Sequence, residues 1–298
     1  MTYYNIDNGH PSEKHVRALE ASEDYRVLRR LPRAREFWCK SMPLPTSTTT
    51  IGVVDCETTG LNADKHKLIE IAIAKLVICD KTGDVVDVRE PRSWCEDPGE
   101  PLTFEIEQLT GLSDADLQGQ AFDQTLFDDA FDNCDVLVSH NARFDRSFLT
   151  RRFPHIRHPW ACSFAEIAWA NHNFGMGRNL GGLLTAAGHF PSAAHRAAPD
   201  SWALTCLLAM QARDGRAIAA HLLQTARKPT LRMHVVNIPY GSTDPFRSAG
   251  YRWNPVRKSW WFENDAERID HESAWARSIS PAIRVECETL DWFDRHAS

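Results

Sequence analysis

In residues 51–61, IGVVDCETTGL, an apolar run ends in two acids and a polar turn. The run is β-branched and apolar, as a strand buried inside a sheet should be. Side chains two residues apart on a strand point to one face, so Asp55 and Glu57 should project together from its end. Two such anions are costly unless a cation lies between them. The stretch therefore predicts a strand with an oxygen-rich site that suits Mg²⁺ or Mn²⁺.

The sequence after this stretch alternates between strand and helix patterns as far as residue 228. LIEIAIAKLVICD (68–80) predicts a second buried strand, and KTGD (81–84) predicts a hairpin turn into a third. This alternation favours an α/β domain with a mixed sheet flanked by helices. The other expected elements are a helix at 103–111 closed by Gly111, an amphipathic helix at 122–134 with Phe122, Leu126, Phe127 and Ala130 on one face, a strand at 135–140, a helix at 142–153, a strand–helix pair at 160–172, and the longest helix from near Pro199.

The two ends of the chain differ from this middle part in their pattern of apolar and polar residues. Residues 12–40 carry apolar side chains at roughly helical intervals, with a break expected at Pro32, and SMPLPTSTTT (41–50) indicates a linker. From about residue 229 the pattern is that of a small α+β unit with an Asn-Pro turn between two strands. We therefore expect a helical N-terminal extension and linker over 1–48, the main α/β domain over 49–228, and a small aromatic-rich α+β domain over 229–298.

The overall composition excludes some classes of protein. Apolar residues make up 43% and charged residues 25% of the chain, which is ordinary for a soluble globular protein. No apolar run has the length of a membrane helix, and the first residues lack a signal-peptide pattern. The eight cysteines include no C-x-x-C pair, so reduced thiols are expected. These features together favour a cytoplasmic protein that does not enter a membrane.

Charge is unevenly distributed along the chain. Residues 49–150 carry 8 basic and 21 acidic side chains, a net charge of −13, whereas residues 151–228 carry 9 basic and 3 acidic ones, a net charge of +6. One interpretation is an acidic half that gathers divalent cations beside a basic half that meets phosphates. The other is that solvated faces simply differ in their charged side chains. Charge alone leaves both open.

Three acidic motifs follow one another along the main domain. DCETTG contains Asp55 and Glu57, NARFD places Asp145 just inside a helix, and HRAAPD places Asp200 near the start of the long helix. In this order they resemble the motifs of the DEDDh (DnaQ-like) 3′→5′ exonucleases, a family that includes the proofreading epsilon subunit of bacterial DNA polymerase III and RNase T. The likeness covers roughly residues 49–215 and implies an RNase H-like sheet.

The resemblance implies a two-metal hydrolysis of phosphodiester bonds, with two Mg²⁺ or Mn²⁺ ions. Asp55 would bridge both ions, and Glu57 and Asp200 would complete one metal site. Asp145 would hold the other ion, partly through water. His195 would be the general base, since an imidazole titrates near neutral pH. Five residues inside a helix separate two side chains by about 140°, so we expect His195 on the loop before the helix and Asp200 in its first turn.

The resemblance also implies a surface for the terminal nucleotide. The backbone of Thr58 and Thr59 would lie near the 3′ end, and Leu61 would wedge against the last base. Phe144 would pack beside the same nucleotide. Loop capping is the alternative role for Leu61, and core packing is that for Phe144. Asn141 is a further substrate-binding candidate, although helix capping suits it better.

Four other residues near the acids have structural interpretations. Gly60 would let backbone approach a ligand closely. Cys56 lies between two acids, so its pKa should be raised and its reactivity low. His140 and Glu70 belong to strands near the site, and we interpret both as supporting residues.

Basic and aromatic residues interleave in YRWNPVRKSWWF (251–262). Aromatic faces beside cations can clamp a single strand, and the candidates are Arg257, Lys258, Trp260 and Trp261. The alternative is that a small domain needs large aromatics to make a core. RVLRRLPRAR (26–35) leaves a similar choice between phosphate contact and a solvated helical face.

Three functions remain open on the sequence. The first is a nuclease that removes nucleotides from the 3′ end of DNA, in repair or turnover. The second is an exoribonuclease, which would differ in reading the 2′-OH. The third is a polymerase-associated proofreading subunit or a nucleic-acid-binding module without activity. The complete set of acids and histidine disfavours an inactive module, and a folded tail favours a free-standing enzyme.

Overall fold

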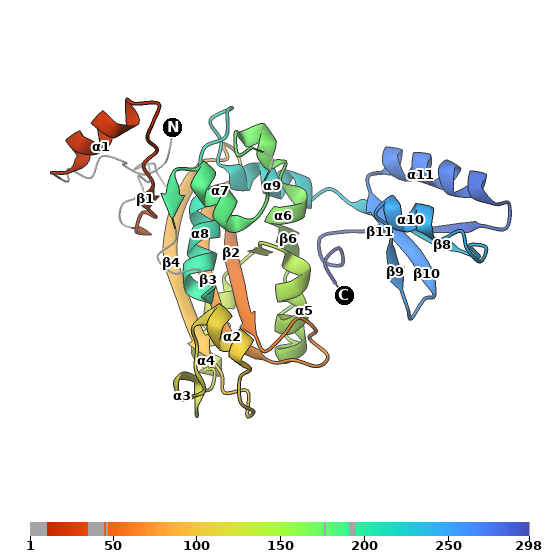
Figure 1. The fold of residues 1–298 in the computed structure, drawn as a ribbon, viewed down its shortest axis with the longest axis horizontal. Helices are drawn as coiled ribbons and strands as arrows, with labels where there is room; N and C mark the ends of the chain where they lie inside the picture. Colours follow the sequence, from red (N-terminus) through yellow and green to blue (C-terminus); the bar gives the residue numbers. More distant parts are fainter. Residues whose placement is uncertain (1–10, 35–44, 46, 176, 191–194, 298) are drawn as a thin grey trace. The chain divides into compact units, whose positions relative to one another are not determined.

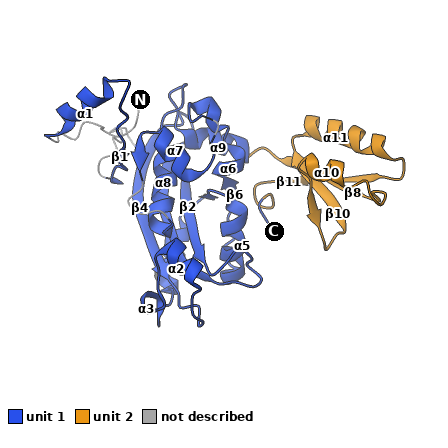
Figure 2. Cartoon of the chain, in the orientation of Figure 1, with its two compact units in different colours: residues 1–226, 296–298 blue, residues 227–295 orange. Residues whose placement is uncertain are grey.

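The computed structural model describes residues 11–34, 45, 47–175, 177–190 and 195–297, which form two compact units (Figures 1 and 2). Unit 1 comprises residues 1–226 and 296–298, and unit 2 comprises residues 227–295. Each unit has a sheet and a hydrophobic core of its own. Within the described ranges, every helix falls short of the length and apolarity needed to cross a bilayer.

Unit 1 is built on a five-stranded mixed sheet with the order β4-β3-β2-β5-β6 (Figure 1). β2 (Thr48–Thr58), β3 (Leu68–Cys79) and β4 (Val85–Cys95) form an antiparallel meander. β5 (Val136–Ser139) pairs with β2 in parallel, and β6 (Trp160–Cys162) pairs in parallel with β5. Helices flank this sheet, so the expected α/β class and the RNase H-like arrangement of strands are confirmed.

One face of the sheet carries the aromatic part of the core. Val54 and Cys56 of β2 face this side, together with α4 (Gln124–Asp132) and α5 (Ala142–Arg152). The rings of Phe127 and Phe153 stack here with centroids 4.2 Å apart, and both are fully buried. Truncation of such a ring to alanine costs about 3–5 kcal/mol. The core therefore fixes β2 firmly beneath α5.

The opposite face of the sheet carries the acids of β2. Because strand side chains alternate, Asp55 and Glu57 point away from Cys56 and its core. α8 (Ala197–Ala209) covers this face and lies against β2, β3 and β4. Ala72 of β3 is the register partner of Asp55. Its small side chain lets the helix approach the sheet closely.

Most expected elements of unit 1 are present. The helix at 103–111 is α2 (Phe104–Thr110), closed by Gly111 at φ 67° in the left-handed region. The helix of the strand–helix pair expected at 160–172 is interrupted, giving α6 (Ser163–Glu166) and the 3₁₀ helix η2 (Trp169–His172). α8 begins two residues before Pro199 and has 13 residues, one fewer than α11 of unit 2. The remaining elements are α3 (Asp114–Leu117), α7 (Leu180–Ala186), β7 (His189–Phe190) and α9 (Ile218–Ala226).

The helix expected over 12–40 is wrong beyond its first part. α1 (Glu13–Glu20) is helical, but β1 (Arg29–Arg30) is a strand that pairs in parallel with β7. Leu31 is buried, and Trp202 Nε1 of α8 donates a hydrogen bond to the Pro32 carbonyl (2.8 Å). Residues 29–30 therefore form a strand with a distant segment in place of the helix that their periodicity predicted. Phe37, and the expected linker as far as residue 44, lie outside the described residues, whereas residues 48–50 of that expected linker belong to β2.

The basic stretch at 26–35 does not form the expected solvated helical face over its described residues, 26–34. Arg29 forms ion pairs with Glu13 and Glu20, at 2.8 and 2.5 Å. Arg26 donates a hydrogen bond to the carbonyl of Thr185 in α7 (2.6 Å). The Arg26 contact ties this segment to the rest of unit 1.

Unit 2 is a small α+β unit with an antiparallel sheet in the order β11-β8-β10-β9. Its core cluster includes Met233, Val235 and Phe246. The Asn-Pro turn between two strands is confirmed, since Asn254 Oδ1 accepts hydrogen bonds from the backbone of Val256 (3.0 Å) and Arg257 (2.9 Å). The elements are β8 (Thr230–Val236), α10 (Asp244–Ser248), β9 (Arg252–Asn254), β10 (Ser259–Asn264), α11 (Ala266–Ile279) and β11 (Arg284–Leu290).

Candidate active site

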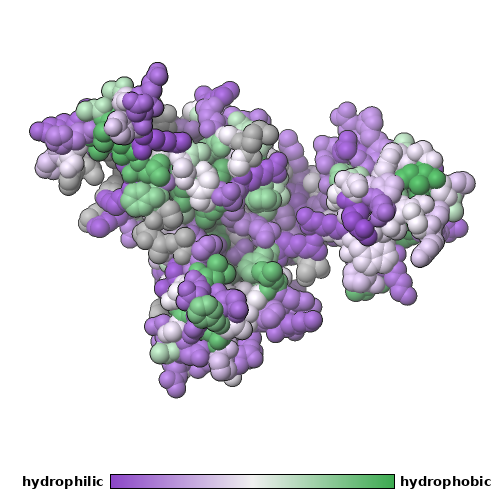
Figure 3. All heavy atoms as spheres, viewed as in Figure 1, coloured by the Kyte–Doolittle hydropathy of each residue, from purple (hydrophilic) through white to green (hydrophobic). Residues whose placement is uncertain are grey.

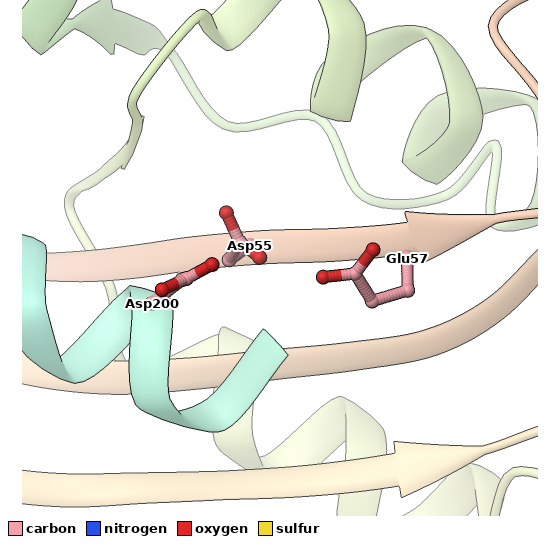
Figure 4. Close-up of side chains that lie close together, drawn as sticks. All are labelled: Asp55, Glu57 and Asp200. Atoms are coloured by element: carbon pink, nitrogen blue, oxygen red, sulfur yellow. The ribbon is translucent and has the colours of Figure 1, made fainter. Parts of the chain in front are cut away.

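Three carboxylates from two elements meet on the α8 face of the unit 1 sheet. Asp55 and Glu57 project from β2, and Asp200 projects from the first turn of α8 (Figure 4). One carboxylate oxygen from each lies within 4.8 Å of the others. The strand geometry thus places Asp55 and Glu57 together, and helix packing adds the third acid.

The electrostatics of this group show the cost of crowding anions. Burial, followed by the charges of Asp145 and Glu57, raises the pKa of Asp55 well above its usual value. Burial, with the charge of Asp200 next, raises the pKa of Glu57 to about 8. Burial also raises the pKa of Asp200, against a hydrogen bond from the His195 backbone that lowers it. A cation would relieve this repulsion directly.

Asp145 approaches the group from the other side of the sheet. β5 ends at Ser139, so the later residues of β2 have no β5 partner beside them. The first turn of α5 carries Asp145 to this unpaired edge of β2. Asp145 is 3% exposed. Burial raises its pKa to about 7, although hydrogen bonds from the backbone and thiol of Cys56 oppose that shift. Asp145 therefore lies beside the three-carboxylate group but outside it.

His195 lies just before α8, as its spacing from Asp200 predicted. The helix begins at Ala197 with Arg196 as its N-cap, and Asp200 falls in the first turn. The His195 backbone N–H donates to Asp200 Oδ2 (3.1 Å), and its side chain is exposed. Its φ of 58° is uncommon for a residue with a side chain. The histidine is thus coupled to Asp200 through the backbone.

Arg196 is a residue of this site that the sequence reasoning missed. Its Nε and Nη2 donate to the two carboxylate oxygens of Glu70, at 2.9 and 3.0 Å. Glu70 is 1% exposed and lies opposite Glu57 in the register of β2 and β3. A lone acid inside the apolar run LIEIAIA was the available signal, because a buried carboxylate needs a partner. The interpretation of Glu70 as a supporting residue agrees with this contact.

The loop after β2 is closed by threonine contacts. The Thr58 hydroxyl donates to the Gly60 carbonyl (2.7 Å), and Thr59 Oγ1 accepts from the Lys67 backbone (3.0 Å). A Cβ at Gly60 would meet the His66 ring at 2.7 Å, so the absence of a side chain here makes room for that ring. Leu61 is 87% exposed beyond this turn. An exposed leucine is available for contact with a substrate.

Exposed apolar side chains also occur on nearby α2. Figure 3 shows apolar side chains exposed among polar ones over this helix. Phe104 and Leu109 are its large exposed apolar residues. Surfaces of this kind often mark interaction sites.

The neighbouring candidates have mixed outcomes. Asn141 occupies the N-cap position of α5, but its side chain makes no capping hydrogen bond, so the expected capping role was wrong. Its φ of 95° gives another reason for an asparagine here, since asparagine tolerates the left-handed region. Phe144 is half-buried against the core, with its ring 5.1 Å from that of Phe148. His140 contacts the Ser163 hydroxyl (2.8 Å) and the Arg178 carbonyl (2.7 Å), as a supporting residue would.

Cys56 behaves as its position predicted. The residue is buried, and burial followed by the charge of Asp145 raises the pKa of its thiol well above the usual value. A thiol that stays protonated is a weak nucleophile and metal ligand. The chemistry of the site therefore rests with the oxygen ligands.

The donor set fits a hard divalent cation. The clustered ligand atoms are all carboxylate oxygens, the ligands that Mg²⁺ and Mn²⁺ prefer. In the part of the chain that the structure describes, no other group of acids, histidines or cysteines has this geometry. Asp55, Glu57 and Asp200 are therefore the candidate metal ligands, with Asp145 alongside.

The aromatic candidates of unit 2 divide between two faces of its sheet. Trp260 packs against the core of the unit, whereas its neighbour Trp261 points to the other face. There the guanidinium groups of Arg232 and Arg252 lie 4.7 and 5.4 Å from the Trp261 ring. Arg257 forms ion pairs with two glutamates of β11. The two tryptophans therefore cannot line one surface together.

Comparisons with known proteins agree on the class of this domain. The model of the RNase T family, described as an exonuclease, matches residues 53–207. The PolC-type DNA polymerase III of Halalkalibacterium halodurans is 40% identical over 112 residues, which is 37% of this chain. That of Streptococcus pyogenes is 38% identical over 104 residues. The chain spans 7% of the length of these two relatives.

Solved structures similar to this chain include two DNA complexes. Exonuclease X with a 5′-overhanging duplex shares 22% identity, with a TM-score of 0.40, over 53% of this chain and 89% of its own. An exonuclease I of E. coli with a dA16 oligonucleotide shares 14% identity, with a TM-score of 0.47, over 82% of this chain and 63% of its own.

Proposed function

Because the chain belongs to the RNase T exonuclease family, we propose that it is a DEDDh-type 3′→5′ exonuclease that acts on DNA. The observation that carries the proposal is the meeting of Asp55, Glu57 and Asp200, with His195 joined to the last of them. Phosphodiester hydrolysis needs these two components, a place for cations and a base for water.

The carboxylates would hold two Mg²⁺ or Mn²⁺ ions. Asp55, Glu57 and Asp200 would form one metal site, and Asp145 with Asp55 would form the other. When bound, the ions supply activation of the attacking water and stabilisation of the leaving 3′ oxygen. The raised pKa values of the four acids support this role, since each anion is costly without a cation.

His195 would take the proton from the attacking water at a ring nitrogen. Its exposed side chain and its position before α8 leave the imidazole free to turn toward the substrate. The bond from its N–H to Asp200 Oδ2 would keep it beside the metal ligands. The histidine in this place is the feature that supports the DEDDh branch for this chain.

The loop after β2 would receive the terminal nucleotide. The Thr58 and Thr59 backbone would lie near the 3′ end, and exposed Leu61 would wedge against the last base. Asn141 and Phe144, at the start of α5, would border the same nucleotide. Unit 2 would by itself contact single-stranded nucleic acid through Arg257, Lys258 and Trp261, with Trp260 supporting from the core side of its sheet.

A second candidate is proofreading together with a DNA polymerase. The likeness to PolC-type DNA polymerase III, which extends over 37% of this chain, favours this second candidate.

Incubation of 5′-labelled DNA and RNA oligonucleotides with Mg²⁺ or Mn²⁺ tests the main proposal. A ladder that shortens from the 3′ end supports it, and DNA preferred over RNA supports the substrate.

A further inference from the structure

Glu70 is an acid beside the metal-binding group to which the proposed hydrolysis gives no role. It lies in β3, opposite Glu57, and it is almost completely buried. Its carboxylate accepts hydrogen bonds from Arg196 Nε (2.9 Å), Arg196 Nη2 (3.0 Å) and the Ala197 backbone N–H (3.1 Å). All three donors belong to the two residues that follow His195 and begin α8.

We propose that Glu70 and Arg196 form a positioning pair that holds His195 and Asp200 in the arrangement needed for hydrolysis. The inference rests on the proposed function. Neither member of the pair needs to touch the substrate, since both act through the residues that they hold.

Fold stability alone is a weak reason for this pair. Burial of a carboxylate next to other carboxylates is costly, and a single arginine repays that cost only with good geometry. An apolar residue at position 70 would suit the strand, whose neighbours Ile69 and Ile71 are fully buried. Replacement of a buried ion pair by apolar residues often leaves a protein equally stable. The charged pair is better explained by the segment that it holds.

That segment is the one on which the histidine depends. His195 has a φ of 58°, an infrequent conformation for a residue other than glycine. The His195 backbone N–H donates a hydrogen bond to Asp200 Oδ2. The next two residues, Arg196 and Ala197, donate hydrogen bonds to the Glu70 carboxylate. A bidentate arginine–carboxylate contact fixes direction as well as distance. Loss of the pair should therefore let residues 195–197 adopt other conformations.

The same contact fixes the helix against the sheet. Glu70 binds the first N–H of α8, and Asp200 lies three residues further along that helix. Glu57, on the neighbouring strand, is the register partner of Glu70. The distance between the acids of β2 and the acid of α8 thus depends on one buried carboxylate. In addition, the Arg196 charge offsets the repulsion that Glu70 exerts on Glu57.

Four variants of the full chain separate positioning from folding. Arg196→Met removes the cation, and Arg196→Lys keeps the charge without the bidentate geometry. The double variant Glu70→Leu/Arg196→Met removes both charges and leaves no buried acid unpaired. Arg152→Met is the matched control, because Arg152 makes an equivalent bidentate contact with Glu96, at 2.9 and 2.6 Å, from the end of α5.

Two readouts apply to each folded variant. The first is kcat and KM on a 5′-labelled single-stranded DNA oligonucleotide with Mn²⁺. The second, independent of activity, is the set of His195 imidazole signals in ¹H–¹⁵N NMR spectra, assigned with His195→Gln. We expect Arg196→Met and the double variant to lose about 10–100-fold in kcat, as is typical for outer contacts of a metal site, and to shift the imidazole signals. Arg196→Lys should recover part of kcat, and Arg152→Met should match the wild type in both readouts.

The outcomes distinguish this inference from the proposed function. Wild-type kcat in the folded double variant, or unchanged imidazole signals in both Arg196→Met and the double variant, would overturn the positioning role. An equal loss of kcat in Arg152→Met would do the same, since the effect would then be general. If the wild type shortens no oligonucleotide, the proposed function fails, and the imidazole signals alone decide whether the pair positions His195.

Discussion

Glu57 and Glu70 lie directly opposite each other on the antiparallel strands β2 and β3. Glu70 is paired with Arg196, whereas Glu57 belongs to the group formed with Asp55 and Asp200. Two acids in register therefore have different surroundings. One is neutralised by the protein itself, and the other has a raised pKa that a bound cation would lower.

Removal of the histidine should separate catalysis from metal binding. In His195→Gln we expect kcat to fall about 10²–10⁴-fold, the usual contribution of a general base. Metal affinity should stay unchanged, because the ligands are the carboxylates. Calorimetric titration with Mn²⁺ alongside oligonucleotide turnover checks both. A variant that loses Mn²⁺ binding together with activity would show that His195 serves the metal site instead.

The metal-free protein should lose stability as the pH rises. The pKa of Glu57 is raised to about 8 and that of Asp145 to about 7 in the folded chain, against ordinary values of 4.5 and 3.8. Between these limits the folded chain binds more protons than the unfolded chain, so the free energy of unfolding falls with rising pH. In EDTA, we expect Tm to drop by roughly 5 °C between pH 5.5 and 8.

Glu57→Gln is the control for that pH dependence. The variant lacks the carboxyl, so its Tm should fall less over the same pH range. Thermal unfolding of both proteins, followed by circular dichroism at several pH values, measures the difference. Parallel curves for the two proteins would contradict the buried, repelling carboxylates.

Divalent cations should stabilise the fold in proportion to their binding. At 100 times the dissociation constant, a ligand specific for the folded state adds about 2.7 kcal/mol, which corresponds to a rise in Tm of roughly 5–10 °C. Mg²⁺ or Mn²⁺ should produce this shift in the wild type. Asp200→Asn should lose most of the shift, while its metal-free Tm stays equal or rises because one repelling anion is removed. An undiminished shift in Asp200→Asn would place the cation elsewhere.

Single-strand binding by unit 2 should depend on its cations and on Trp261. Arg257→Ala with Lys258→Ala should weaken oligonucleotide binding and lower its salt dependence, with a change in slope of about 0.7 for each phosphate that is no longer neutralised. Trp261→Ala should cost about 1–3 kcal/mol if a base stacks on the ring. Arg277→Ala, at an exposed position of α11, is the matched control. Fluorescence anisotropy with a labelled single strand measures all of these, and equal affinities throughout would reject the contact.

The sequence predicted the sheet and its acids well because their signals are local. Asp55 and Glu57 share a face through strand alternation alone, and the long apolar runs leave little choice for β2 and β3. The interval between His195 and Asp200 likewise placed one before the helix and the other inside it.

The failures concern contacts between distant parts of the chain. Arg196 and Glu70 are 126 residues apart, and neither residue's neighbours reveal the other. Arg29 was assigned to a helix, but its strand pairs with β7 about 160 residues away, a partner that helical periodicity cannot indicate. Asn141 was expected to cap α5, and its left-handed φ is a backbone property that the residue type only permits.

The most direct test is the degradation of 5′-labelled DNA by the wild type and by Asp200→Ala. With Mg²⁺ or Mn²⁺, we expect the wild type to give a ladder that shortens one nucleotide at a time from the 3′ end. Asp200→Ala, folded to the same extent, should leave the oligonucleotide intact over the same period. A wild type that shortens no DNA or RNA, or an Asp200→Ala variant that is as active as the wild type, would contradict a metal-dependent exonuclease site built on these carboxylates.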